Sequence, residues 1–126
     1  EVSNRASSQQ HSFEKQSLKK LIETNKYQLA YDVNEEFEKK IRESTQFSGE
    51  FLQGIREYKQ VSIEKMAEMT RISKNNIRNI ESENMDPLPA LVYVRGFVYQ
   101  YAKCLKLNPE LVASSYMHQL KKKQEN

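Results

Sequence analysis

Two serines near the middle of the chain constrain its fold more than any other feature, because each stands directly before a short run of apolar residues with helical spacing. These apolar residues are Ile63, Met66 and Ala67 in the first run and Ile77 and Ile80 in the second. A serine hydroxyl at such a position accepts a hydrogen bond from a free backbone N–H, so Ser62 and Ser73 each predict the start of a helix. Only residues 70–72 separate the two helices. Two short capped helices joined by a tight turn predict a helix-turn-helix.

Three further helices are predicted around this motif. Their apolar positions are Phe51, Leu52, Ile55 and Tyr58 before the motif, Val94, Val98, Tyr101, Ala102 and Leu105 after it, and Val112, Tyr116 and Leu120 in a last helix. Pro87 and Pro89 break the chain after the motif, since proline lacks an amide donor. The segment Asn108-Pro109-Glu110 supplies a cap, a first-turn proline and an acidic residue for the last helix. We therefore expect an all-α fold, a compact five-helix bundle over residues 47–120.

The N-terminal part of the chain carries weaker signals. Residues 1–12 are almost free of apolar side chains and predict a disordered tail. Residues 13–46 form a helical and extended segment or linker, with short amphipathic helices predicted over 13–24 and 34–43. Between these helices, apolar residues alternate at Tyr27, Leu29, Tyr31 and Val33. The alternation predicts either an extended linker lying over the helical domain or a strand that pairs with another sheet. At the other end, residues 121–126 are expected to be a basic tail.

Composition limits the classes of function. The formal net charge of +3 and a pI near 8.9 permit a nucleic-acid partner without demanding one. A single cysteine, Cys104, excludes a disulfide within the chain and favours a reducing, cytoplasmic setting. No apolar run reaches the roughly 18 residues of a membrane span.

Features of an enzyme are not found in the sequence. His11 falls in the predicted tail, and His118 has no evident nucleophile or metal partner nearby in the sequence. Cys104 is interpreted as a small buried residue, and three glycines form no phosphate-binding loop. We expect a binding module with no catalytic residues, no cofactor, no metal ion and no small-molecule substrate.

Three stretches within residues 47–120 together resemble the cytoplasmic helix-turn-helix domain of RodZ-like bacterial cytoskeletal proteins. The first two, residues 48–57 and 61–81, are shared with phage-repressor-like DNA-binding proteins. The third, residues 88–103, discriminates between the two groups. It contains Tyr93-Val94-Arg95-Gly96-Phe97 followed a turn later by Tyr-Ala, which is similar to the fourth helix of the RodZ-like family and is not found in generic repressors.

The resemblance implies a fold of about five helices and an adaptor that binds the actin-like filament protein MreB at the inner face of the membrane. Members of the family usually continue into a membrane span, whereas nothing after Lys123 is hydrophobic in this sequence. Any membrane attachment is therefore expected only through segments outside this chain.

The candidate partner-binding residues lie on the helix predicted over 90–105. Tyr93, Phe97 and Gln100 follow one stripe at the edge of the core positions, beside Arg95. The two aromatic side chains either pack inside the domain or form an exposed anchor, and the resemblance favours the anchor. Gly96 costs roughly 1 kcal/mol relative to alanine within a helix, so we expect close approach of a neighbouring helix or of a partner there.

The alternative function is sequence-specific DNA binding by the helix that Ser73 caps. Its polar residues, Lys74, Asn75, Asn76, Arg78 and Asn79, are groups that read bases or hold phosphates. Glu81 and Glu83 are expected to cancel the two positive charges of this helix, which argues against DNA because phosphate contacts need excess positive charge.

Overall fold

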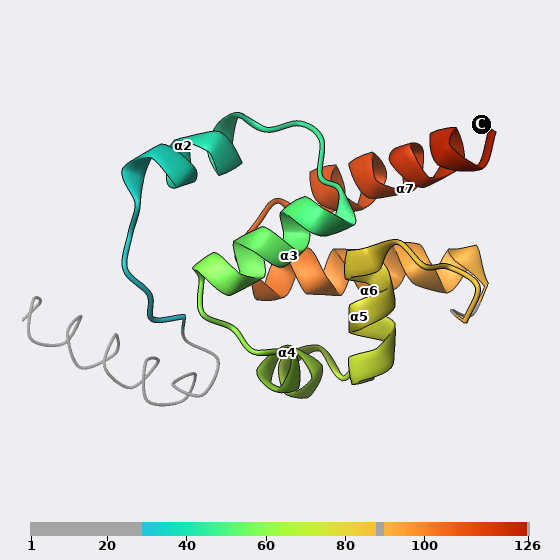
Figure 1. The fold of residues 1–126 in the computed structure, drawn as a ribbon, viewed down its shortest axis with the longest axis horizontal. Helices are drawn as coiled ribbons and strands as arrows, with labels where there is room; N and C mark the ends of the chain where they lie inside the picture. Colours follow the sequence, from blue (N-terminus) through green and yellow to red (C-terminus); the bar gives the residue numbers. More distant parts are fainter. Residues whose placement is uncertain (1–28, 88–89, 126) are drawn as a thin grey trace, which may run out of the picture.

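The structure, a computed structural model, describes residues 29–87 and 90–125 (Figure 1). Over these residues it contains six helices and no strand. The helices are α2 (Glu35–Glu43), α3 (Gly49–Tyr58), α4 (Ile63–Thr70), α5 (Lys74–Ser82), α6 (Leu91–Cys104) and α7 (Pro109–Glu125). The predicted all-α fold is confirmed, with α3 to α7 as the five-helix bundle and α2 before it. The predicted tail over 1–12, the predicted helix over 13–24 and Tyr27 lie outside the described residues.

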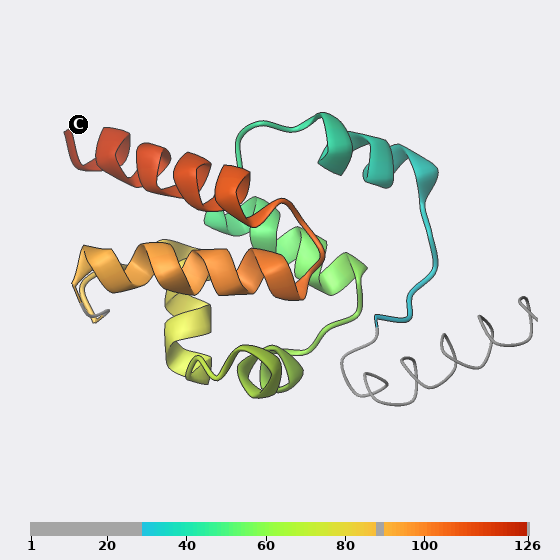
Figure 2. The ribbon, with the colours of Figure 1, turned by 180° about the vertical axis from the view of Figure 1, so that it is seen from behind.

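Helices α6 and α7 form the centre of the bundle. They run side by side in opposite directions, and α3 crosses them on one side (Figures 1 and 2). Helices α4 and α5 lie on the side of α6 that faces away from α7. Every core position predicted for α6 and α7 is buried, and so are Leu52, Ile55, Met66, Ile77 and Ile80 from the first three helices of the bundle. The helical spacing of apolar residues therefore predicted the core because it gives each helix one buried stripe.

The predicted caps have the expected geometry. The hydroxyl of Ser62 accepts a hydrogen bond from the backbone N–H of Lys65 at 3.0 Å, and that of Ser73 accepts one from Asn76 at 3.2 Å. Asn108 caps α7 by accepting a hydrogen bond from the N–H of Leu111. Between α4 and α5 the chain turns where Arg71 adopts a left-handed conformation with φ of 61°.

The segment before α3 lies over the bundle. Residues 29–34 form neither helix nor strand, and the ring of Tyr31 packs edge-on against Tyr58 with 5.1 Å between centroids. The phenol of Tyr31 donates a hydrogen bond to Glu38, and Ile41 of α2 is buried against the core. Among the described residues of this segment, Tyr31 therefore lies against α3, and pairing of the alternating residues with another chain stays a prediction.

The C-terminal helix is longer than expected. Residues 121–125, predicted to be part of a basic tail, continue α7 as regular helix to Glu125. No proline or glycine interrupts the chain after Leu120, and lysines in a last helical turn interact favourably with the helix dipole. No helix among the described residues is long and apolar enough to cross a membrane.

Candidate functional site

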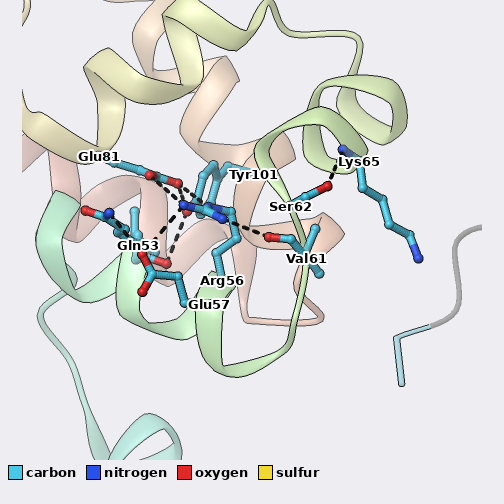
Figure 3. Close-up of polar contacts among 9 residues, drawn as sticks. Gln53, Arg56, Glu57, Val61, Ser62, Lys65, Glu81 and Tyr101 are labelled. Atoms are coloured by element: carbon cyan, nitrogen blue, oxygen red, sulfur yellow. Dashed lines mark hydrogen bonds and ion pairs between the residues drawn. The ribbon is translucent and has the colours of Figure 1, made fainter. Parts of the chain in front are cut away.

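A buried polar cluster fixes α3, α5 and α6 against one another (Figure 3). The guanidinium of Arg56 donates hydrogen bonds to Glu81 at 2.6 and 3.1 Å and to the carbonyl oxygen of Val61 at 2.8 Å. The phenol of Tyr101 donates to the same carboxylate at 2.6 Å. Burial, followed by the negative charge of Glu81, raises the pKa of this phenol, so Tyr101 stays protonated and donates. The cluster therefore sets which face of α6 turns outward.

The outward face of α6 begins with three consecutive apolar residues. Leu91, Val92 and Tyr93 are 46%, 76% and 59% exposed. Successive residues on a helix point about 100° apart, so three in a row cannot all face one core. Tyr93 is a predicted site residue. Leu91 and Val92 were missed, although the same run of apolar letters could have identified them.

The other predicted partner-binding residues lie further along the same helix. Arg95 is exposed and forms an ion pair with Glu110 of α7 at 2.6 Å. Gln100 is also exposed, whereas Phe97 is half-buried and packs against the core. Each interpretation of the aromatic stripe therefore fits one residue: Tyr93 is exposed to solvent, and Phe97 packs partly inside the domain.

The structure corrects part of the expectation for Gly96. A methyl group built on Gly96 meets nothing within 4 Å, so no neighbouring helix of the bundle approaches it. Close packing instead occurs at Gly49, where an added methyl group would collide with the carbonyl oxygens of Ile80 and Glu81. Sequence reasoning missed Gly49 because the contact joins α3 to the end of α5.

The polar residues predicted to contact DNA lie on α5. Lys74, Asn75 and Arg78 are exposed, while Asn76 and Asn79 are half-buried. The expectation that Glu81 cancels their charge is wrong, because this carboxylate is buried and paired with Arg56. Glu83 accepts a hydrogen bond from the N–H of Gly49 and lies 3.8 Å from Lys123. Neither carboxylate is therefore a free charge on the exposed face of α5.

Of the residues considered for catalysis, Cys104 and His118 lie on different helices, and His11 lies outside the described residues. Cys104 is half-buried with its Sγ 3.7 Å from Sδ of Met69, and burial raises the pKa of its thiol. His118 is exposed on α7. Among the described residues no group of His, Cys, Asp and Glu could hold a metal ion.

Comparison with known proteins agrees with the geometry of the motif. Residues 51–112 match a family model described as a helix-turn-helix domain, which spans α3 to the start of α7. No curated protein and no solved structure matches the chain significantly. The chain therefore carries a helix-turn-helix domain in which α4 and α5 are the two helices of the motif.

Proposed function

We propose that the chain is a non-enzymatic adaptor that binds a protein partner through the exposed face of α6. The observation that supports this most directly is the exposure of Leu91, Val92 and Tyr93 at the start of that helix. Contiguous exposed apolar side chains mark binding surfaces in soluble proteins. Arg95, exposed two residues further on, belongs with tyrosine among the residue types that dominate interface energetics.

Gly96 adds a second argument. Glycine lowers the stability of a helix by roughly 0.5–1 kcal/mol relative to alanine, and nothing in the bundle compensates for it at this position. A partner whose backbone packs closely on α6 would use the space that a side chain would occupy. The glycine therefore favours the outward face of α6 as the point of contact.

For the partner we propose an actin-like filament of the MreB type. Its identity rests on the resemblance of residues 88–103 to the fourth helix of RodZ-like proteins, where the aromatic residues of that stretch meet MreB. Tyr93 and Phe97 are the corresponding residues of this chain.

The proposal is tested by co-sedimentation of the purified chain with MreB filaments. Aromatic anchors near the centre of an interface are each worth about 2 kcal/mol or more, so Tyr93→Ala combined with Phe97→Ala should weaken binding by roughly a thousandfold. Val33→Ala is the matched control, because it removes an apolar side chain that is 61% exposed but lies before α2. The control variant should pellet with filaments like the unaltered chain.

Because Phe97 packs partly on the core, folding has to be measured alongside binding. Circular dichroism and the melting temperature report whether the double variant remains helical. Tyr93→Ala alone removes an exposed side chain, so it should leave the melting temperature unchanged and still weaken binding by about thirtyfold. If the folded variants pellet like the unaltered chain, α6 is not the docking surface.

A second candidate function is DNA binding by α5. It is favoured by one observation: Lys74, Asn75 and Arg78 are exposed while the nearest acidic side chain of the helix, Glu81, is buried. Selection from a pool of random duplexes at about 150 mM salt tests it. A selected duplex whose binding is lost in Asn75→Ala with Arg78→Ala would support sequence-specific recognition. The absence of any enriched sequence would exclude it.

A further inference from the structure

The outward stripe of α6 ends in a pocket between α4 and α6. This pocket has a volume of about 210 Å³ and is lined by Met69, Thr70, Gln100, Lys103 and Cys104. Gln100 belongs both to the pocket and to the stripe that contains Tyr93 and Phe97, so the pocket continues the proposed docking surface. Two of its lining residues, Met69 and Cys104, carry polarizable sulfur atoms that are in contact with each other, and such side chains pack adaptably against aliphatic groups.

Three lysines lie at or near this pocket. Lys103 lines the pocket, Lys65 precedes the lining residue Met69 by one turn of α4, and Lys106 follows the lining residue Cys104 by two positions. In Figure 3 the Lys65 side chain extends away from the buried cluster. Across the described ranges 29–87 and 90–125, none of the three forms an ion pair.

A fourth lysine lies beneath this end of α6. Lys59 lies buried below the end of α6, where its Nζ donates a hydrogen bond to the carbonyl oxygen of Leu105. Burial lowers the pKa of Lys59, the negative charge of Glu38 opposes this effect, and the positive charge of Lys106 adds to it. Lys59 and Lys106 therefore carry like charges near each other at this end of α6.

From this arrangement we infer that the pocket between α4 and α6 receives an acidic segment of the partner protein, with one aliphatic side chain packed onto Met69 and Cys104 and its carboxylates facing Lys65, Lys103 and Lys106. The inference rests on the proposed function, since it names the chemistry of the partner at the far end of the same helix face. A complementary acidic segment would fix the direction in which the partner lies along α6, because Tyr93 at the other end has apolar neighbours.

Charge reversal tests the lysines. Lys65→Glu, Lys103→Glu and Lys106→Glu in one chain should weaken co-sedimentation with MreB filaments by at least about tenfold. The matched control reverses three exposed lysines elsewhere, Lys39, Lys121 and Lys122, with the same change in net charge, and should bind within about twofold of the unaltered chain. Equal binding by the two folded triple variants would overturn the inference, and equal weakening would reduce it to an effect of net charge.

Cys104 supplies a readout that needs no substitution, because it is the single cysteine of the chain. Its alkylation by iodoacetamide should slow by about fivefold or more when filaments are bound, since a seated side chain would cover the thiol. An unchanged alkylation rate in the bound state would show that the partner stops short of the pocket, and would overturn the inference even if the Tyr93 variants lose binding.

A peptide separates failure of this inference from failure of the proposed function. A synthetic peptide with a leucine flanked by glutamates is titrated into the full chain while amide signals are followed by NMR. Shifts confined to Met69, Gln100 and Cys104 that vanish in the charge-reversed triple variant support the pocket even if filaments do not bind. No shift with the peptide, together with loss of duplex binding in the same variant, would assign the lysines to phosphate and overturn the inference.

Discussion

At the scale of single residues, the most consequential feature is the ion pair between Arg56 and Glu81. Both side chains are buried, with 8% and 4% of their surface exposed. Removing one member of such a pair leaves an uncompensated buried charge, which costs far more than the net stabilisation from the intact pair. Tyr101 shares the carboxylate, so the cluster ties α6 to α3 and α5.

Glu81→Gln is expected to lower the free energy of unfolding by about 3–5 kcal/mol, because the Arg56 guanidinium would remain buried without a counter-charge. Urea denaturation measures the change. Glu57→Gln is the matched control: its carboxylate lies 3.9 Å from the same guanidinium but is 60% exposed, and its loss should cost less than about 1 kcal/mol. Similar losses in the two variants would contradict the assignment of Glu81 as the structural counter-ion.

At the scale of the elements, the helices of the motif are too short to be stable alone. Helix α4 has eight residues and α5 has nine, whereas isolated helices shorter than about 12–15 residues are marginal in water. Their serine caps satisfy free N–H groups and their buried isoleucines and methionine attach them to α3 and α6. Helix α6 is longer but has no side-chain cap, and Gly96 lies within it.

Gly96→Ala should therefore stabilise the protein by about 0.5–1 kcal/mol while weakening filament binding, because the added methyl group has free space in the bundle but would meet a closely packed partner. Gly54→Ala in α3 is the control, since a methyl group there also meets nothing within 4 Å. It should raise the melting temperature similarly and leave binding unchanged. If Gly96→Ala binds as tightly as the unaltered chain, the partner does not pack on this part of α6.

At the scale of the whole molecule, several buried groups make the free energy of unfolding vary with pH in the alkaline range. Burial, followed by the charge of Glu83, raises the pKa of Tyr116 above its ordinary value of 10.0, and Tyr101 is shifted in the same direction. Above about pH 10 the unfolded state loses these protons while the folded state keeps them, so stability falls as pH rises. Lys59 acts oppositely, because burial lowers its pKa and the unfolded state then holds the extra proton.

We expect the loss of unfolding free energy between about pH 9 and pH 11 to be smaller by about 1.4 kcal/mol in Tyr116→Phe than in the unaltered chain. The comparison cancels the contribution of Lys59, which is present in both chains. The phenol donates a hydrogen bond to the carbonyl oxygen of Ile80 at 2.6 Å, so the variant should also be less stable at neutral pH by about 1 kcal/mol. Parallel pH profiles would show that Tyr116 titrates normally in the folded protein.

The local features of this fold could be predicted from the sequence. Helical spacing, the caps at Ser62, Ser73 and Asn108, and the break at Pro87 each depend on residues within one or two turns. The same spacing placed Tyr93 at the edge of the core positions, and its side chain is exposed together with those of Leu91 and Val92.

The features that could not be predicted from the sequence depend on contacts between elements far apart in the chain. From the sequence, the charge of Glu81 is expected to oppose Lys74 and Arg78. In the fold it is paired with Arg56, which lies 25 residues earlier in the chain. Gly96 and Gly49 are both helical glycines, yet only Gly49 lies against another backbone. Periodicity reports which side of a helix is buried, but the charge that a side chain presents and the space around a glycine depend on which helices meet, and that is set by tertiary packing.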